Sequence, residues 1–176
     1  MIIWFTGISG VGKTTLAQIT YKILKKKFQN LIHLDGDQFR KLMNNDLGFS
    51  LQDRNTNAKR LINFVHFLSK SKMNLIISAN LTSNFYRKYC KKNLKNFYEI
   101  NITTNLEILK QRDKKKIYNK IDKTNIVGYG IKNHLNKTAF RKIANNGSKK
   151  ELIISLKSVL REIFKSKGKK NDYSII

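Results

Sequence analysis

A glycine-rich segment near the start of the chain limits the possible folds more than any other feature. Residues 2–5 are apolar (Ile-Ile-Trp-Phe), and residues 7–14 read G-I-S-G-V-G-K-T, which fits the pattern G-x-x-x-x-G-K-[ST]. The apolar run has the length of a buried strand, and the apolar residues that follow Thr14 recur at helical spacing. A strand, a glycine loop and a helix in this order predict a phosphate-binding loop.

The chemistry of phosphate binding explains the residue types in this loop. Glycines let the backbone curl until successive N–H groups face a polyphosphate, and the next helix adds its positive N-terminal end. Lys13 can reach the β- and γ-phosphates, and the Thr14 hydroxyl can ligate Mg²⁺. A glycine-rich turn without a ligand is the alternative, and the combined strand, spacing, lysine and threonine argue against it. We therefore expect ATP, with Mg²⁺ as cofactor, to contact Gly7, Ser9, Gly10, Val11, Gly12, Lys13, Thr14 and Thr15.

The rest of the chain alternates candidate strands and helices, which is typical of a parallel sheet covered on both faces. Strands are predicted at residues 2–6, 31–34, 74–79 and 97–102, with a less regular fifth near 138–144. Helical patterns run from the loop to about residue 28, then near 54–70, 84–93, 105–113 and after Ser148. The expected fold class is α/β, with a P-loop NTPase-type parallel β-sheet of about five strands sandwiched between helices.

The chain length of 176 residues fits one such domain. We assign it to residues 1–165 and expect residues 166–176 to form a basic, flexible tail. Within the domain, residues 113–137 are dominated by charged and polar side chains. A basic lid there has a physical rationale, because phosphoryl transfer requires that water be excluded.

The net charge of +25 by itself suggests a nucleic acid or an anionic surface as partner. However, lysines are scattered along the whole chain, Asn and Ile are abundant, and Pro is absent, as AT-rich coding would produce. We therefore expect no specific nucleic-acid partner. A nucleotide-dependent nucleic-acid-binding module remains an alternative of another class.

Cellular location is predicted from cysteine content and hydropathy. The single cysteine, Cys90, excludes an internal disulfide and suits a reducing compartment. No apolar stretch reaches membrane-spanning length, and a strand starting at residue 2 leaves no room for a signal peptide. We expect a cytoplasmic protein with no membrane association, and a homodimer is left open.

Two aspartates follow the second predicted strand in the sequence L-D-G-D-Q-F-R, residues 34–40. Ligands of open parallel sheets collect beyond the carboxyl ends of strands, so Asp35 and Asp37 are expected at the same edge as the phosphate loop. There they can act on the Mg²⁺ shell and accept a proton from an attacking hydroxyl, with Asp35 as the candidate metal residue beside Thr14. The alternative is that Asp37 only caps a helix.

Further motifs follow in order: D-L-G-F-S at residues 46–50, D-R-N-T-N-A-K-R at 53–60 and R-D-K-K-K-I-Y at 112–118. With the phosphate loop and L-D-G-D-Q-F-R, this ordered set resembles the adenylylsulfate kinase family, and the resemblance covers nearly the whole chain. These are small P-loop kinases that phosphorylate the ribose 3′-hydroxyl of adenylylsulfate. The resemblance implies a P-loop kinase domain at residues 1–165, with ATP and a small nucleotide acceptor as partners.

The resemblance also implies individual roles. Lys13, Asp35 and Asp37 would be catalytic, and Arg112 would join the residues that bind ATP. Arg40, Arg54 and Asn57 would hold the anionic groups of the acceptor, and Lys115 and Ile126 would contribute from the lid. Phe49 would stack on the acceptor base, with a place in the core as its alternative. Surface ion pairing is the alternative for the two arginines.

Three departures from the family pattern fall in the acceptor half. The family stretch I-S-P-Y-R is not recognisable at residues 80–85, F-T-G is replaced by Ile126-Val127-Gly128, and R-D-P-K-G has lost its Pro and Gly. In the family, the Phe of F-T-G closes the other face of the acceptor adenine. A base clamp with one aromatic face instead of two loses stacking energy of about 1 kcal/mol or more. Adenylylsulfate is the expected acceptor, and another nucleotide, such as the cytidine diphosphoramidate used in bacterial capsule modification, is the alternative.

Overall fold

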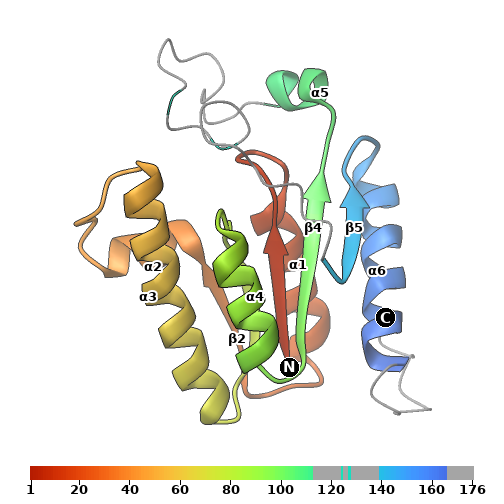
Figure 1. Ribbon diagram of the computed structural model, residues 1–176. Coiled ribbons are helices and arrows are strands. Elements are labelled where there is room, and N and C mark those ends of the chain that lie inside the picture. Colours follow the sequence, from red (N-terminus) through yellow and green to blue (C-terminus); the bar gives the residue numbers. More distant parts are fainter. Residues whose placement is uncertain (113–123, 125–126, 128–138, 166–176) are drawn as a thin grey trace.

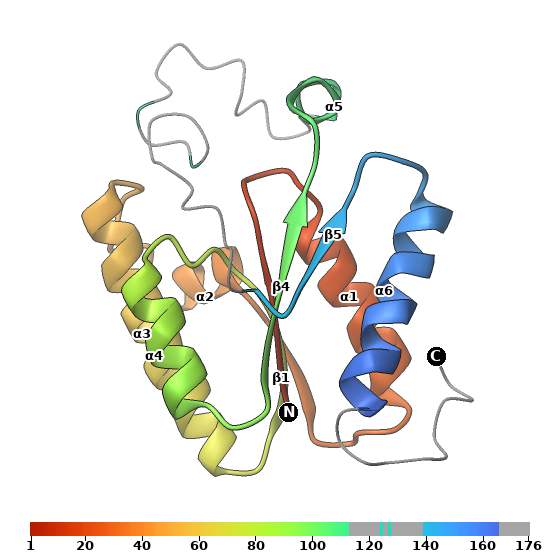
Figure 2. The same ribbon diagram turned by 45° about the vertical axis from the view of Figure 1, so that its right-hand side comes forward.

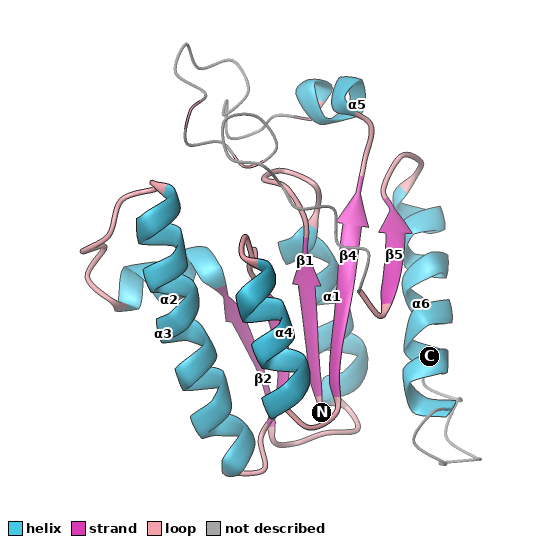
Figure 3. Cartoon of the chain, in the orientation of Figure 1, coloured by secondary structure: helices cyan, strands magenta, loops and turns pink. Residues whose placement is uncertain are grey.

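One parallel sheet organises the computed structural model, which describes residues 1–112, 124, 127 and 139–165. Its strand order is β2-β3-β1-β4-β5 (Figures 1 and 3). The strands are β1 (Ile2–Thr6), β2 (Leu31–Asp35), β3 (Asn74–Ser78), β4 (Phe97–Thr103) and β5 (Arg141–Ala144). The helices are α1 (Lys13–Lys25), α2 (Gly36–Leu42), α3 (Leu51–Lys70), α4 (Asn84–Asn93), α5 (Leu106–Gln111) and α6 (Lys149–Lys165).

The central strand β1 explains why the first apolar run is continuous. It pairs in parallel with β3 and β4, so that Phe5 lies between Ser78 and Ile100. All five residues of β1 are buried. A strand covered on both faces needs apolar side chains on both, because neither face reaches water.

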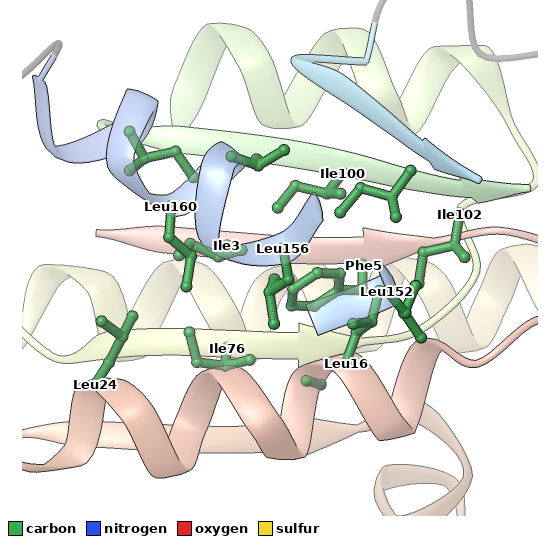
Figure 4. Close-up of a cluster of buried hydrophobic side chains, with 14 of the residues drawn as sticks. Ile3, Phe5, Leu16, Leu24, Ile76, Ile100, Ile102, Leu152, Leu156 and Leu160 are labelled. Carbon is green, nitrogen blue, oxygen red and sulfur yellow. The ribbon is translucent and has the colours of Figure 1, made fainter. Parts of the chain in front are cut away.

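Successive residues of β1 enter two different cores. Ile3 and Phe5 join a cluster with residues of α1 and α6, such as Leu16 and Leu156 (Figure 4). On the opposite face, Ile2 and Trp4 pack with residues of α3 and α4. Figure 2 shows the same division, with α3 and α4 on one side of the sheet and α1 and α6 on the other. The three-layer arrangement confirms the predicted fold class.

A buried polar network lies under α4 and leads to the end of β1. Glu99 Oε1 accepts from Arg87 Nε at 3.1 Å and from Thr6 Oγ1 at 2.9 Å. The Arg87 and Glu99 side chains are 2% and 0% exposed, so neither charge could be removed singly without a large cost. Burial, and secondarily the carboxylate of Glu99, raises the pKa of Cys90 to about 12. The Cys90 thiol is therefore protonated at neutral pH and is not a nucleophile.

The differences from the expected elements have local causes. The sequence of β5 has a weak apolar pattern because β5 is a short edge strand in which only Ile143 is buried. Helix α3 begins at Leu51, before the expected residue 54, because the Ser50 hydroxyl accepts from the N–H of Asp53 and caps it. Helix α1 ends at Lys25. The helix after Ser148 is confirmed as α6.

The proposed lid and tail fall largely outside the described residues, as do Lys115 and Ile126. Val127, which lies within the predicted lid segment, is described and is fully buried. Among the described helices, none combines the length and the apolar character needed to cross a bilayer.

Candidate active site

A cleft of about 310 Å³ opens where the carboxyl ends of β1, β2 and β3 meet. Its walls come from the phosphate loop, the segment after β3 and the helices α2 and α3. In Figure 1 this is the upper end of the sheet. The lining residues are Ser9, Gly10, Gly12, Lys13, Thr14, Thr15, Asp35, Gly36, Asp37, Arg40, Phe49, Arg54, Asn57, Ala58, Leu61, Ser78, Ala79, Asn80, Thr82 and Arg112.

The phosphate loop has the curled backbone that its glycines predict. Gly7, Gly10 and Gly12 have positive φ angles of 141°, 77° and 103°. A Cβ on Gly7 would collide with the carbonyl oxygen of Ile102, so that position also requires glycine for lack of space. Lys13 Nζ donates to the carbonyls of Gly7 at 3.0 Å and Ile8 at 2.7 Å, which holds the ammonium across the loop. The cation is therefore already positioned where a polyphosphate would enter.

Asp35 connects the second strand to the phosphate loop. Its Oδ2 accepts from Thr14 Oγ1 at 2.8 Å and from Ser78 Oγ at 2.7 Å. Its Oδ1 accepts from the N–H groups of Asp37 and Gln38, so Asp35 is the N-cap of α2. The idea that Asp37 provides this cap is therefore wrong. Asp37 instead lies in the exposed first turn of α2 and lines the cleft.

The surroundings of Asp35 keep it ionised. Burial alone would raise its pKa, but hydrogen bonds from Ser78, Thr14 and two backbone N–H groups outweigh burial, so the pKa lies below the usual value. Ser78 also contacts His33 Nε2, at 3.0 Å. Burial lowers the pKa of His33, and the nearby Asp35 opposes that shift. The result is a carboxylate charge beside the Thr14 hydroxyl at neutral pH.

Two arginines lie close to the ring of Phe49 in the wall of the cleft. The guanidinium carbon of Arg40 lies 4.9 Å from the ring centroid and that of Arg54 lies 5.4 Å from it. Arg40 Nη1 donates to the carbonyls of Leu47 and Gly48, and Arg54 Nε donates to that of Phe49, which fixes the loop before α3. Phe49 is 55% exposed, so its placement in the core is ruled out.

The positive charge of Arg54 is destabilised by its surroundings. Burial, and then the charge of Arg40, lowers the pKa of Arg54, although Asp37 opposes the effect. Among the described residues, the buried Arg40 is bonded to backbone carbonyls and to no carboxylate, which argues against a surface ion pair. An anion between the two guanidinium groups would relieve their repulsion.

Two asparagines add unsatisfied acceptors to the wall of the cleft. Asn57, on α3, and Asn80, just after β3, each have a buried Oδ1 without a hydrogen-bond partner among the described residues. A buried acceptor left unpaired costs about 1–3 kcal/mol. Ser78, Asn80 and Thr82 were not predicted as site residues. Their position at the end of the third predicted strand, at the ligand-binding edge of the sheet, could have indicated that they belong to the site.

Most of the site residues predicted from the sequence are thus found together in the cleft. The predicted residues that line the cleft are Ser9, Gly10, Gly12, Lys13, Thr14, Thr15, Asp35, Asp37, Arg40, Phe49, Arg54, Asn57 and Arg112. Gly7 and Val11 are not part of the lining; both are buried and shape the loop from behind. Their expected contact with ATP remains a prediction.

The model of the family described as adenylylsulphate kinase matches residues 1–139, which include every element that lines the cleft. The chain belongs to the adenylylsulfate kinase family. It is accordingly an ATP-dependent phosphotransferase.

Similar proteins support this membership of the adenylylsulfate kinase family. A cytidine diphosphoramidate kinase of Campylobacter jejuni is 34% identical over 165 residues, covering 92% of this chain and 95% of its own. An adenylyl-sulfate kinase of Buchnera aphidicola is 38% identical over 120 residues, covering 67% of this chain and 58% of its own. The structure of the Mycobacterium tuberculosis APS kinase CysC with AMPPNP and APS superposes with a TM-score of 0.76 at 26% identity, covering 93% and 96% of the two chains.

The residues of this adenylylsulfate kinase site suit Mg²⁺ held together with the nucleotide. Among the described residues, no group of three His, Cys, Asp or Glu side chains could hold a metal ion. Thr14 and Asp35 offer oxygen atoms 2.8 Å apart, and Mg²⁺ is usually held by one or two such groups with substrate phosphates and water. The donor set suits a magnesium–ATP complex.

The low pKa of Asp35 predicts a pH-dependent contribution to stability. A carboxyl group whose pKa is lower in the folded state stabilises the fold above its unfolded-state pKa of about 3.9, and loses that effect as the pH falls through the folded-state value. We expect Asp35→Asn to lower the midpoint of thermal unfolding at pH 7 and the difference from wild type to shrink below about pH 4. A difference that stays constant between pH 7 and pH 3 would contradict this account.

Proposed function

We propose that this protein transfers the γ-phosphoryl group of ATP to the ribose 3′-hydroxyl of a small nucleotide, with adenylylsulfate as the first candidate. One observation carries the proposal. The phosphate loop and the Arg40–Phe49–Arg54 cluster line the same cleft, and Asp35 and Asp37 are also part of its lining. Donor and acceptor can therefore share one cavity, as a direct transfer requires.

The donor half supplies positioning and positive charge. Backbone N–H groups of the loop and Lys13 would hold the β- and γ-phosphates, and Thr14 with Asp35 would hold Mg²⁺. When bound, Mg²⁺ neutralises charge that develops on the phosphate oxygens. Asp37, exposed in the first turn of α2, would accept the proton of the attacking hydroxyl. The low pKa of Asp35 suits it to the cation rather than to the proton.

The acceptor half suits a nucleotide with a charged 5′ group. A guanidinium has five N–H donors, so Arg40 and Arg54 can hold their loop and still bind phosphate or sulfate oxygens. The exposed ring of Phe49 offers a face on which a base can stack. Donors on that nucleotide would satisfy the Oδ1 atoms of Asn57 and Asn80, which no described residue pairs.

Cytidine diphosphoramidate is the second candidate acceptor, and one observation favours it. The Campylobacter jejuni kinase matches this chain almost end to end, whereas the adenylyl-sulfate kinase of Buchnera aphidicola matches only about two thirds of it. The sequence departures at residues 80–85 also lie in the acceptor half. In addition, a phosphoramidate carries N–H donors that a sulfate lacks, and the cleft contains two acceptors that have no partner within the described part of the chain.

An ATP-consumption assay with both acceptors in parallel tests the proposal. We expect magnesium-dependent turnover with adenylylsulfate or with cytidine diphosphoramidate, and none with the 3′-deoxy form of the active compound. AMP and CMP, which lack the second group on the 5′-phosphate, serve as matched controls and should react poorly because Arg40 and Arg54 lose a ligand. Turnover with the 3′-deoxy acceptor, or with neither intact acceptor, would refute the proposal.

The proposal also covers the cellular location of the protein and its partners other than the two nucleotides. We assign the protein to the cytoplasm, with Mg²⁺ as cofactor and no specific nucleic-acid or membrane partner, and we leave a homodimer open. The excess of lysine predicts only weak, salt-sensitive binding to polyanions. Salt-titrated binding to duplex and single-stranded DNA separates this from the alternative of a nucleic-acid-binding module. Tight DNA binding with no phosphorylation of a small acceptor would favour that module.

A further inference from the structure

Asn145 contacts three segments on the donor side of the site: the end of β4, the phosphate loop and Arg112. It is part of none of the sequence motifs that indicated the family. It is the first residue after β5. Its backbone N–H donates to the carbonyl of Thr103 at 2.7 Å, and its own carbonyl accepts from Thr104 Oγ1 at 2.9 Å. These two bonds fix the backbone of Asn145 against the end of β4, so the side chain projects from a rigid base.

The amide nitrogen of this side chain reaches the phosphate loop. Asn145 Nδ2 donates to the carbonyl of Val11 at 2.9 Å, a contact between residues 134 positions apart. In a trans peptide, the C=O of one residue and the N–H of the next point in opposite directions. With the Val11 carbonyl held toward Asn145, the N–H of Gly12 is turned away from it. The side chain thereby sets the orientation of a peptide unit within the loop.

The same nitrogen also packs against Gly12. A Cβ on Gly12 would lie 2.8 Å from Asn145 Nδ2, and Gly12 has a left-handed φ of 103°. Gly12 is the N-cap of α1, and no side chain of the described residues caps that end. The contact therefore supports the loop at the point where it becomes the helix that would face the phosphates.

The amide oxygen of Asn145 holds Arg112, the predicted ATP-binding residue after α5. Arg112 Nη1 donates to Asn145 Oδ1 at 3.1 Å and to its backbone carbonyl at 2.9 Å, and Nη2 donates to the carbonyl of Gly147 at 3.0 Å. Arg112 lines the cleft. Asn145 thus connects the guanidinium of Arg112 with the loop through a single planar amide.

We infer that Asn145 is a positioning residue for the donor nucleotide: its amide orients the Val11–Gly12 peptide and holds Arg112 beside the phosphate loop. The inference rests on the proposed binding of ATP at this loop. Asn145 would act through these two contacts, not by touching the substrate. Its effect should therefore be specific for ATP and small for the acceptor.

Direct binding of a non-hydrolysable ATP analogue with Mg²⁺ tests the inference, with acceptor KM measured alongside. We expect Asn145→Ala to raise the dissociation constant of the analogue about tenfold, a change of about 1.4 kcal/mol. Asn145→Asp should weaken binding further, because a carboxylate cannot donate to the Val11 carbonyl and adds negative charge near the triphosphate. The acceptor KM should stay within about twofold, since no acceptor group is lost.

Asn146→Ala is the matched control. Asn146 is the next residue, is exposed, and accepts through Oδ1 from the N–H of Asn105. It should leave the affinity for the analogue within about twofold, because an exposed hydrogen bond is readily replaced by water.

Three results would overturn the inference: unchanged affinity in Asn145→Ala, an equal loss in Asn146→Ala, or equal losses for ATP and acceptor with a lowered unfolding temperature. The last pattern would mean a general role in folding. Because the analogue is measured without turnover, a failure to phosphorylate either acceptor would refute the proposed acceptors while leaving this test intact.

Discussion

Lys13→Ala is expected to abolish turnover while leaving the fold intact. Lys13 is the cation held across the phosphate loop by the carbonyls of Gly7 and Ile8. Charge that develops on the transferred phosphoryl group would lose its fixed positive partner. Removing one preorganised group of this kind typically costs a factor of about 10² to 10³ in kcat, and loss of ATP affinity would add to it. Steady-state kinetics with the active acceptor measures both effects.

Lys22→Ala supplies the control for that experiment. Lys22 lies on the same helix, α1, but is exposed and outside the cleft. Its removal changes the net charge by the same amount and should leave kcat and both KM values near wild type. Circular dichroism and thermal unfolding establish that each variant is folded. Unimpaired turnover in folded Lys13→Ala would defeat the assignment of the phosphate loop.

Asp37→Asn should chiefly lower kcat, by about 10² or more, because an amide cannot accept the proton of the attacking hydroxyl. The substitution keeps the size of the side chain, and Asp37 contributes its backbone N–H, not its carboxylate, to the cap of α2. The KM for ATP should therefore change little. Single-turnover measurements separate the chemical step from product release and show which of them has slowed.

Asp46→Asn provides the comparison for Asp37. Asp46 forms an exposed ion pair with Arg60 at 2.7 Å and is outside the cleft. Exposed pairs contribute about 0–1 kcal/mol, so this variant should retain wild-type kinetics. If Asp37→Asn altered only KM, Asp37 would have a binding role and no part in proton transfer.

The site could be predicted where its residues are close in sequence. The glycines, Lys13 and Thr14 form one local pattern, and Asp35 follows a strand at the edge where ligands bind. These residues are found together in the cleft because the parallel sheet brings its carboxyl ends to one side. The order of the motifs also identified the family correctly.

Other features depend on contacts that the sequence does not display. The bond between Asn145 and Val11 joins residues 134 positions apart, so no local pattern could indicate it. Capping by Asp37 was an alternative to its catalytic role because both aspartates suit an N-cap, and only the structure shows that Asp35 is the cap of α2. The exposure of Phe49 likewise depends on how Arg40 and Arg54 hold its loop.

Trp4, which packs in the core beneath α3 and α4, provides an intrinsic fluorescence signal for this protein. It is the single tryptophan of the chain, it is fully buried, and its indole N–H donates to the carbonyl of Ala79 at 2.9 Å. Its emission therefore reports on one known environment, without contributions from other indoles. Since Ala79 lines the cleft beside Asn80, titrations of nucleotides and of denaturant can share one label-free fluorescence signal.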